Sequence, residues 1–214
     1  MLSATFTLLA RDSASGQMGI AVASRFLAVG AVVPFLRPGI GGVATQHFHD
    51  PRIAFAILES LEAGVTPRDA GEKALKQFGE AEKRQVAVLA STVTAGQASG
   101  FVHTGSECQA WSGERVSEDL IVLGNTLVGA QVLADAERAF RASGSPHLSE
   151  RLLEGLLAGD RSGGDRRGKQ AAALKVVGNQ NFQPPIVDLR VDDHPEATLE
   201  LHRIWILHRR RAGT

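Results

Sequence analysis

Residues 5–24 read TFTLLARDSASGQMGIAVAS, two apolar runs separated by a polar turn. The first run, residues 4–10, and the second, residues 19–24, have the composition of β-strands. Between them, residues 12–16 form a cluster of the kind found in turns. The stretch therefore predicts a β-hairpin. Because both runs are apolar on both faces, we expect a sheet that is covered on each side by helices or by a second sheet.

The remaining chain alternates between groups of strands and pairs of helices. Helix caps and apolar periodicity predict helices at residues 51–63, 67–78, 131–142 and 148–158, and a last one opened by Asp193 and Pro195 and ending at Arg211. Apolar runs predict strands at residues 28–33, 40–46, 85–90, 98–103, 119–123, 171–177 and 186–191. This order predicts one α+β domain, residues 1–214, with two mainly antiparallel sheets flanked by helices.

The bulk composition restricts the possible functions. The 214 residues include 23 Lys and Arg and 23 Asp and Glu, so no net charge draws the protein to nucleic acid or to an acidic membrane. The start lacks a signal peptide pattern, and no apolar run is long enough to span a bilayer. Cys108 is the single cysteine, so no internal disulfide is possible. We therefore expect a cytoplasmic protein with no nucleic-acid or membrane partner.

Thr5 is the first residue examined as a nucleophile. A threonine hydroxyl attacks a carbonyl only when a base removes its proton. If Thr5 were the first residue of the mature chain, its own α-amine, with a pKa of about 8, could serve as that base. The alternative is that Thr5 is an ordinary strand residue, because threonine is common in strands.

Other polar residues lie near the ends of predicted elements. Arg25 follows the second strand, where a cation could lower the pKa of a nucleophile or hold a carboxylate, or simply face solvent. Asn125 follows another strand, where its amide could donate to an oxyanion or form a turn. The loop of residues 163–168, GGDRRG, could hold a carboxylate in an arginine fork, or be a solvated loop.

A metal site is a further possibility. His47 and His49 are separated by one residue, a spacing that can place two imidazoles on one metal ion. Asp50 is already explained as a helix cap, and the segment of residues 192–195, DDHP, is more simply a helix start than a metal site.

Taken together, these segments resemble the bacterial family named domain of unknown function 1028, which is placed in the N-terminal nucleophile (Ntn) hydrolase superfamily. The resemblance covers nearly the whole chain. It rests on these stretches: residues 5–7, 10–12, 19–26, 28–34, 44–46, 103–105, 111, 124–125, 163–168, 170 and 187–195.

The resemblance implies a four-layer αββα sandwich and an amidohydrolase acting on a small amide or peptide-like substrate, without metal or cofactor. Thr5 would be the nucleophile, Asn125 the oxyanion donor, and Arg25 a cation for a substrate carboxylate. The remaining substrate-binding residues implied are Gln46, Asp165, Arg166 and Arg167. A homodimer is expected for a domain of this size and family.

The chain differs from the relatives that it resembles at two places. Ala23 occupies the place of an aspartate in the similar strand ending of proteasome β-subunits. Family members typically begin Met-Thr-Phe-Ser, whereas Leu2-Ser3-Ala4 separate Met1 from Thr5 here, so Thr5 can act only if residues 1–4 are removed. Two alternatives are therefore a non-catalytic protein that binds a small acidic ligand or a partner protein, and a metal-dependent hydrolase using His47 and His49.

Overall fold

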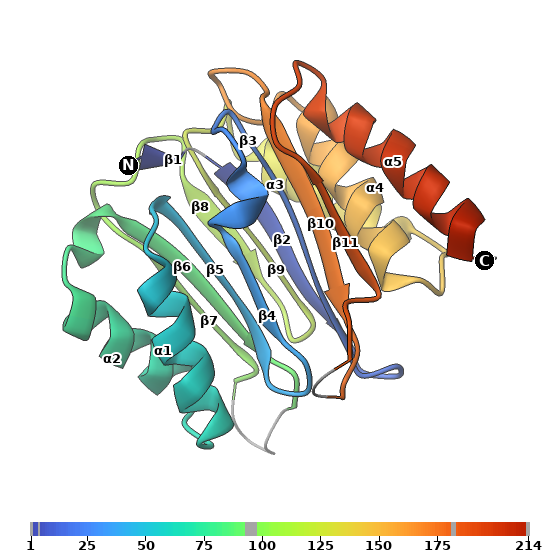
Figure 1. The fold of residues 1–214 in the computed structure, drawn as a ribbon. Helices are drawn as coiled ribbons and strands as arrows, with labels where there is room; N and C mark the ends of the chain where they lie inside the picture. Colours follow the sequence, from blue (N-terminus) through green and yellow to red (C-terminus); the bar gives the residue numbers. More distant parts are fainter. Residues whose placement is uncertain (1, 4, 93–97, 181–182, 213–214) are drawn as a thin grey trace.

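The computed structural model describes residues 2–3, 5–92, 98–180 and 183–212 (Figure 1). These residues form two antiparallel sheets. One has the order β1 (Leu2–Ser3), β5 (Gly41–Phe48), β6 (Arg84–Ala90), β7 (Gly100–Thr104), with β4 (Pro34–Arg37) also paired to β5. The other has the order β11 (Val187–Val191), β10 (Ala171–Val177), β3 (Gln17–Ser24), β2 (Thr5–Asp12), β9 (Leu120–Asn125), β8 (Gly113–Val116).

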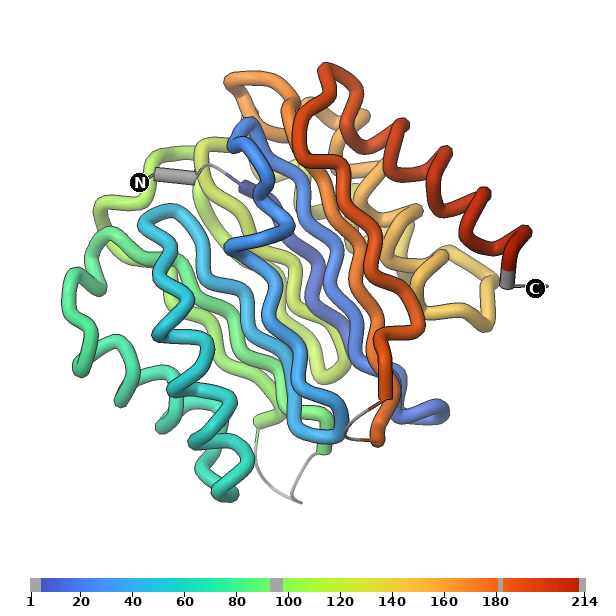
Figure 2. Tube along the Cα trace, in the orientation of Figure 1, coloured from blue at the N-terminus to red at the C-terminus, as the bar shows by residue number. Residues whose placement is uncertain are grey.

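Helices cover the outward faces of the sheets. Helices α1 (Pro51–Glu62) and α2 (Pro67–Phe78) pack on the sheet that contains β5. Helices α3 (Gln131–Ala142), α4 (Leu148–Arg161) and α5 (Ala197–Ala212) pack on the sheet that contains β2. Figure 2 shows α1 and α2 on one side of the two sheets and α5 on the other. Among the described residues, no helix combines the length and apolarity required to cross a membrane.

The predicted hairpin is confirmed as β2 and β3. Their register runs from Thr5 opposite Ser24 to Asp12 opposite Gln17. The Asp12 carboxylate accepts hydrogen bonds from two backbone amides of the turn, and Gly16 closes the turn with a φ of 69°. Strand β2 lies inside its sheet, between β3 and β9, so both of its backbone edges are paired.

The two faces of β2 serve different cores. Phe6 and Leu8 belong to the apolar cluster shared with α3 and α4. Leu9 belongs to a second cluster, which also contains Ala44 of β5 and Leu89 of β6. Because successive side chains of a strand point to opposite faces, the odd-numbered residues of β2 face the other sheet. Thr5, Thr7, Leu9 and Arg11 therefore lie along the inter-sheet face.

The helix caps were also predicted. The Asp50 side chain accepts from the Arg52 amide at the start of α1, and the Thr66 hydroxyl accepts from the Asp69 amide at the start of α2. The predicted ranges of α3 and β10 agree with the structure, while α4 continues to Arg161, three residues beyond its predicted end.

One strand assignment was wrong. Residues 28–33 contain a single 3₁₀ turn, Val29–Ala31, instead of a strand. The turn begins at Ala28, which has a left-handed φ of 53° and is fixed by a backbone hydrogen bond to Asp192. The strand comes immediately afterwards as β4, and β8 was not predicted at all. Strand β8 pairs with β9 at the edge of its sheet and carries mostly exposed residues, so it lacks an apolar pattern.

The inter-sheet core predicts a large cost for removing Leu9. Leu9→Ala should lower the free energy of unfolding by about 2–5 kcal/mol, because the fully buried side chain leaves a cavity between the sheets. Leu27→Ala is the matched control, since Leu27 is 59% exposed and its truncation should change stability by less than about 0.5 kcal/mol. Urea denaturation followed by circular dichroism measures both, and equal effects would contradict this account of the core.

Candidate functional site at the start of strand β2

Three polar side chains lie in a row across three neighbouring strands of one sheet, at one end of those strands. Thr5 is the direct cross-strand partner of Ser24 on β3 and of Asn125 on β9. Directly paired residues of antiparallel strands project on the same face, so all three side chains face the other sheet. Thr5 and Asn125 are fully buried, and Ser24 is 2% exposed. The Thr5 hydroxyl donates to the Ser24 hydroxyl over 3.3 Å.

Two glutamines of the other sheet complete a buried polar network with this row. Gln46 accepts from the Thr7 hydroxyl at 2.7 Å and donates to the Thr5 carbonyl at 3.3 Å. Gln85 accepts from the Gln46 amide at 2.7 Å and from the Asn125 amide at 3.1 Å. Buried polar groups are tolerated when they are hydrogen-bonded. Because this network joins the two sheets, it fixes how one sheet is aligned on the other.

The N-terminal segment changes sheets in front of Thr5. Leu2 and Ser3 form β1, which pairs with Phe48 and His47 on the edge of β5. Thr5 begins β2 in the opposite sheet. The Thr5 nitrogen is a peptide nitrogen in this chain, and the α-amine required for N-terminal nucleophile chemistry does not exist until residues 1–4 are removed. Met1 and Ala4 lie outside the described residues.

The loop of residues 163–168 packs against the end of the hairpin. Its Asp165 is 6% exposed and accepts from the backbone amide of Arg25 at 3.0 Å. The same carboxylate binds the guanidinium of Arg167 through two nitrogens, at 3.1 and 2.8 Å. On the other side, the backbone amide of Arg166 donates to Thr126 next to Asn125. Asp165 thus holds the loop beside β3 and β9.

The three arginines near this site have different surroundings. Arg166 donates to the Ala110 carbonyl at 2.8 Å, and Arg167 is held by Asp165. Arg25 is exposed and donates to the Arg167 carbonyl. It also lines a pocket of about 300 Å³ together with Lys169, Gln170, Asp193, His194 and Pro195. The structure therefore places Arg25 at the surface, one residue beyond Ser24, and Thr5 is not among the residues that line its pocket.

The two histidines do not form a common site. His47 is 2% exposed, with Nδ1 2.7 Å from the Lys83 carbonyl and Nε2 accepting from the Gln109 amide at 3.4 Å. His49 packs edge-on against Phe26, and burial lowers its pKa. In the part of the chain that the structure describes, no group of three or more His, Cys, Asp or Glu side chains could hold a metal ion. The His47–His49 hypothesis gains no geometric support.

Backbone strain occurs next to the polar network. His47 follows Gln46 with a φ of 62°, and Thr126 follows Asn125 with a φ of 55°. A residue other than glycine rarely adopts a positive φ, and such strain is concentrated at functional sites. Both residues are buried and hydrogen-bonded, so the surrounding structure holds the strain. The two strained residues therefore directly follow Gln46 and Asn125, which both belong to the polar network.

Comparison with known proteins identifies the family. Residues 5–201 match the group described as "Family of unknown function (DUF1028)". The chain belongs to this family. A crystal structure of the DUF1028 protein SPO2555 from Silicibacter pomeroyi is 30% identical, with a TM-score of 0.86 over 97% of this chain and 87% of that one. The DUF1028 match begins at Thr5, so residues 1–4 lie outside the matched range.

More distant comparisons add no functional assignment. The ancestral beta-subunit Anbu from Yersinia bercovieri is 11% identical, with a TM-score of 0.45 over 95% of this chain and 93% of that one. No curated protein matches the chain. Membership of DUF1028 therefore supplies a family but no reaction, and the chemistry has to be argued from the residues around Thr5.

Sequence reasoning missed the residue at the centre of the network. Gln85 makes hydrogen bonds to Gln46, Asn125, Thr104 and the Gly124 carbonyl, which come from both sheets. It was treated only as the first residue of an apolar strand. A glutamine at a strand end normally faces solvent, and nothing in its local sequence distinguishes a buried one. Gln46 was noted as a substrate-binding residue, yet its amide is occupied by three internal partners.

The role of Asp165 predicts how the loop responds to mutation. Asp165→Ala should release the backbone around Arg166 and Arg167, because the carboxylate anchors the loop to Arg25. Limited trypsin digestion should then cleave after these arginines at least about tenfold faster, since cleavage follows the population of the open form. Asp188→Ala is the control, because Asp188 is a 49% exposed partner of Lys175 on β10. Equal cleavage of both variants would rule out this anchoring role.

Cys108 is predicted to be chemically inert. Burial raises the pKa of its thiol to about 11, so the thiol stays protonated at neutral pH. We expect Cys108 to resist Ellman's reagent in the native protein at pH 8 and to react fully after unfolding in urea. Rapid reaction in the native protein would contradict this burial.

Proposed function

We propose that this DUF1028 protein is an Ntn-type amidohydrolase that acts on a small amide or peptide-like substrate after residues 1–4 are removed. The position of Thr5 carries the proposal. Thr5 begins a central strand, and its hydroxyl faces the second sheet beside Ser24 and Asn125. The two antiparallel sheets with outer helices are consistent with the four-layer αββα sandwich that this class of enzyme uses.

The proposed reaction uses groups that the chain would supply itself. The free α-amine of Thr5 accepts the hydroxyl proton, and Oγ1 attacks the carbonyl carbon of the substrate amide. A C–O bond forms, the C–N bond breaks, and the Thr5 ammonium gives its proton to the departing amine. Water then attacks the resulting ester while the Thr5 amine accepts its proton. The bond between the acyl carbon and Oγ1 breaks, the ammonium returns the proton to Oγ1, and the carboxylic acid is released.

Asn125 is the proposed donor to the oxyanion. Its side chain lies on the same face as Thr5 on the neighbouring strand. One amide hydrogen is used by Gln85 at 3.1 Å, which fixes the orientation of the amide and leaves its second hydrogen for a substrate. A preorganised donor of this kind stabilises the charge that develops in the transition state.

Arg25 is the proposed cation for a substrate carboxylate. It lies one residue beyond Ser24, is exposed, and lines the pocket of about 300 Å³. In the proposal, Asp165, Arg166 and Arg167 position this part of the site, because their side chains already have partners in the loop and its surroundings. Gln46 likewise orients Thr5 through its carbonyl instead of binding substrate directly.

One observation favours a non-catalytic alternative. Thr5 is fully buried, and Leu2 and Ser3 continue the chain as a paired strand. A protein that kept these residues would have the fold without the N-terminal amine. It could still bind a small acidic ligand in the pocket beside Arg25. The mass of the purified protein distinguishes the two cases, since catalysis requires a chain that begins at Thr5.

A chain produced with Met directly before Thr5 tests the proposal, because a small second residue allows the methionine to be removed. We expect this chain, but not the full-length one, to form a covalent ester with a β-lactone probe and to hydrolyse N-acyl amino acids. Thr5→Ala should lower turnover by more than about a thousandfold, because the nucleophile is lost. Peptide mass spectrometry locates the adduct.

Thr5→Ser is the matched control, since it keeps a hydroxyl and an amine at the same position. It should retain the adduct and part of the turnover. Circular dichroism should show the same fold for both variants. The proposal fails if the chain beginning at Thr5 forms no adduct and releases no amine, or if Thr5→Ala remains as active as its parent.

A further inference from the structure

A second polar position lies at the opposite end of the same strand face. Arg11 is on β2 six residues after Thr5, which places the two roughly 20 Å apart along the strand. Both belong to the odd-numbered set that faces the other sheet. Arg11 is only 7% exposed, although it is charged. A buried arginine requires an explanation, because removing a guanidinium from water is costly unless it is well paired.

The partners of Arg11 do not provide that explanation. Its Nη2 contacts the Glu118 carboxylate at 3.0 Å, but the Glu118 side chain is 80% exposed. Its Nε is buried and has no hydrogen-bond partner in the structure as described. An exposed carboxylate is a weak partner for a buried cation because water competes for it. Buried donors without partners are rare and commonly indicate a water or an ion that fills the space.

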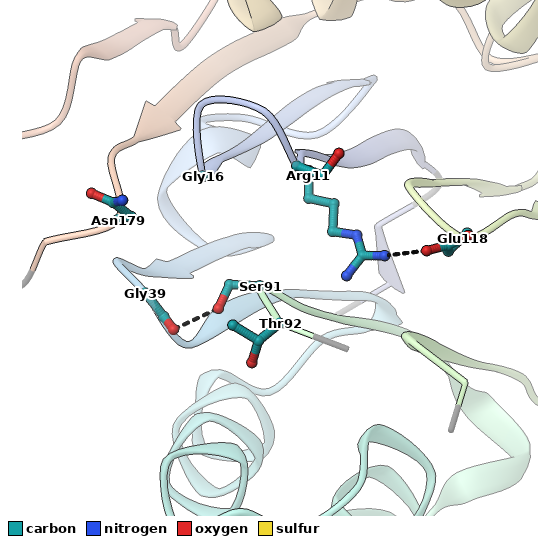
Figure 3. A pocket seen from close by; sticks show the side chains of 8 residues that line it. Arg11, Gly16, Gly39, Ser91, Thr92, Glu118 and Asn179 are labelled. Carbon is teal, nitrogen blue, oxygen red and sulfur yellow. Dashed lines mark hydrogen bonds and ion pairs between the residues drawn. The ribbon is translucent and has the colours of Figure 1, made fainter. Parts of the chain in front are cut away.

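A cavity of about 560 Å³ adjoins Arg11 (Figure 3). Figure 3 shows the guanidinium entering the space between the turn at Gly16 and the strand end at Ser91 and Thr92. The volume is within the usual range of small-molecule sites. The remaining residues that line the cavity are Ser13, Gly39, Glu118 and Asn179.

The wall of the cavity is built by two turns that meet at Asn179. Gly16 and Gly39 both have a positive φ, of 69° and 73°. A Cβ at Gly16 would lie 3.0 Å from the Asn179 side chain, and a Cβ at Gly39 would lie 2.7 Å from the Asn179 carbonyl. Both turns therefore depend on glycine for conformation and for close approach. They hold Asn179 at the cavity opposite Arg11 (Figure 3).

We propose that this cavity binds the oxyanion group of a small polar metabolite, a carboxylate or a phosphate, with Arg11 as the cation. The planar guanidinium matches both groups through paired hydrogen bonds. Ser13, Thr92 and Asn179 supply neutral donors from the walls. Glu118 lines the same cavity, so the rest of the ligand is neutral or cationic. The site is separate from Thr5 and does not depend on the proposed amidohydrolase activity.

Glu118 also competes with the ligand for Arg11. Its carboxylate holds Nη2 in the structure, and a bound oxyanion would take that place. Removing the Glu118 charge should therefore strengthen binding, whereas a loss of the Arg11 fork should weaken it. These opposite effects of the two substitutions on affinity distinguish a specific site from general attraction between an anion and the protein surface.

The test is an NMR titration of the full-length protein with inorganic phosphate and, separately, with glycerate, at constant ionic strength. The Arg11 Nε–H signal, assigned by its loss in Arg11→Lys, should shift in a saturable manner. Arg11→Lys should weaken binding at least about tenfold because the fork geometry is lost. Glu118→Gln should tighten binding about three- to tenfold because a competing charge is removed. The tighter probe identifies the kind of oxyanion.

Three controls make the result decisive. Glu72→Gln removes an equivalent exposed partner of an arginine on α2, and it should leave binding unchanged. Thr5→Ala should also bind normally, since it lies at the other end of β2. Circular dichroism verifies that Arg11→Lys is folded, and Glu118→Gln tests the idea without altering a buried residue. Equal shifts with chloride, or unchanged affinity in both Arg11→Lys and Glu118→Gln, would overturn the proposal.

Discussion

The antiparallel register of β2 with β3 and β9 is the constraint on which both candidate sites depend. It places Thr5 opposite Ser24 and Asn125, so three polar side chains meet at one level of the sheet. The alternation of side chains along β2 then directs Leu9 into the inter-sheet core. A shift of one residue would turn Thr5 toward the helices and Phe6 toward the other sheet. The apolar residues therefore enforce the position of the polar ones.

The polar network and the apolar core have complementary roles between the sheets. Apolar contacts such as those of Leu9 supply stability without direction, because the hydrophobic effect is not directional. Gln46 and Gln85 fix the relative position of the sheets, since each side-chain amide needs hydrogen-bond partners at defined positions. The strained residues His47 and Thr126 lie beside these groups. Rigid surroundings of this kind are the condition for a reactive group that needs fixed neighbours.

In the proposed mechanism, the N-terminal segment decides whether Thr5 can react. As the chain stands, Leu2 and Ser3 extend the sheet of β5 and keep the Thr5 nitrogen in a peptide bond. A fold can thus be shared across a family while the reactive group depends on a few residues in front of it. The Arg11 cavity, at the other end of the strand, is independent of this segment.

The sequence by itself determined the elements whose signals are local. The hairpin, the caps Asp50 and Thr66, and helix α3 follow from turn residues, side-chain hydrogen bonds to nearby amides, and apolar periodicity. Asn125 could be named because it follows an apolar strand, whereas Thr5 gained its importance from the resemblance to the family. Only the tertiary structure decided that Gln85 joins them, that Asp165 holds the neighbouring loop, and that Arg11 is buried beside a cavity. Burial and partners of these residues arise from segments far apart in sequence, and local patterns carry no information about such contacts.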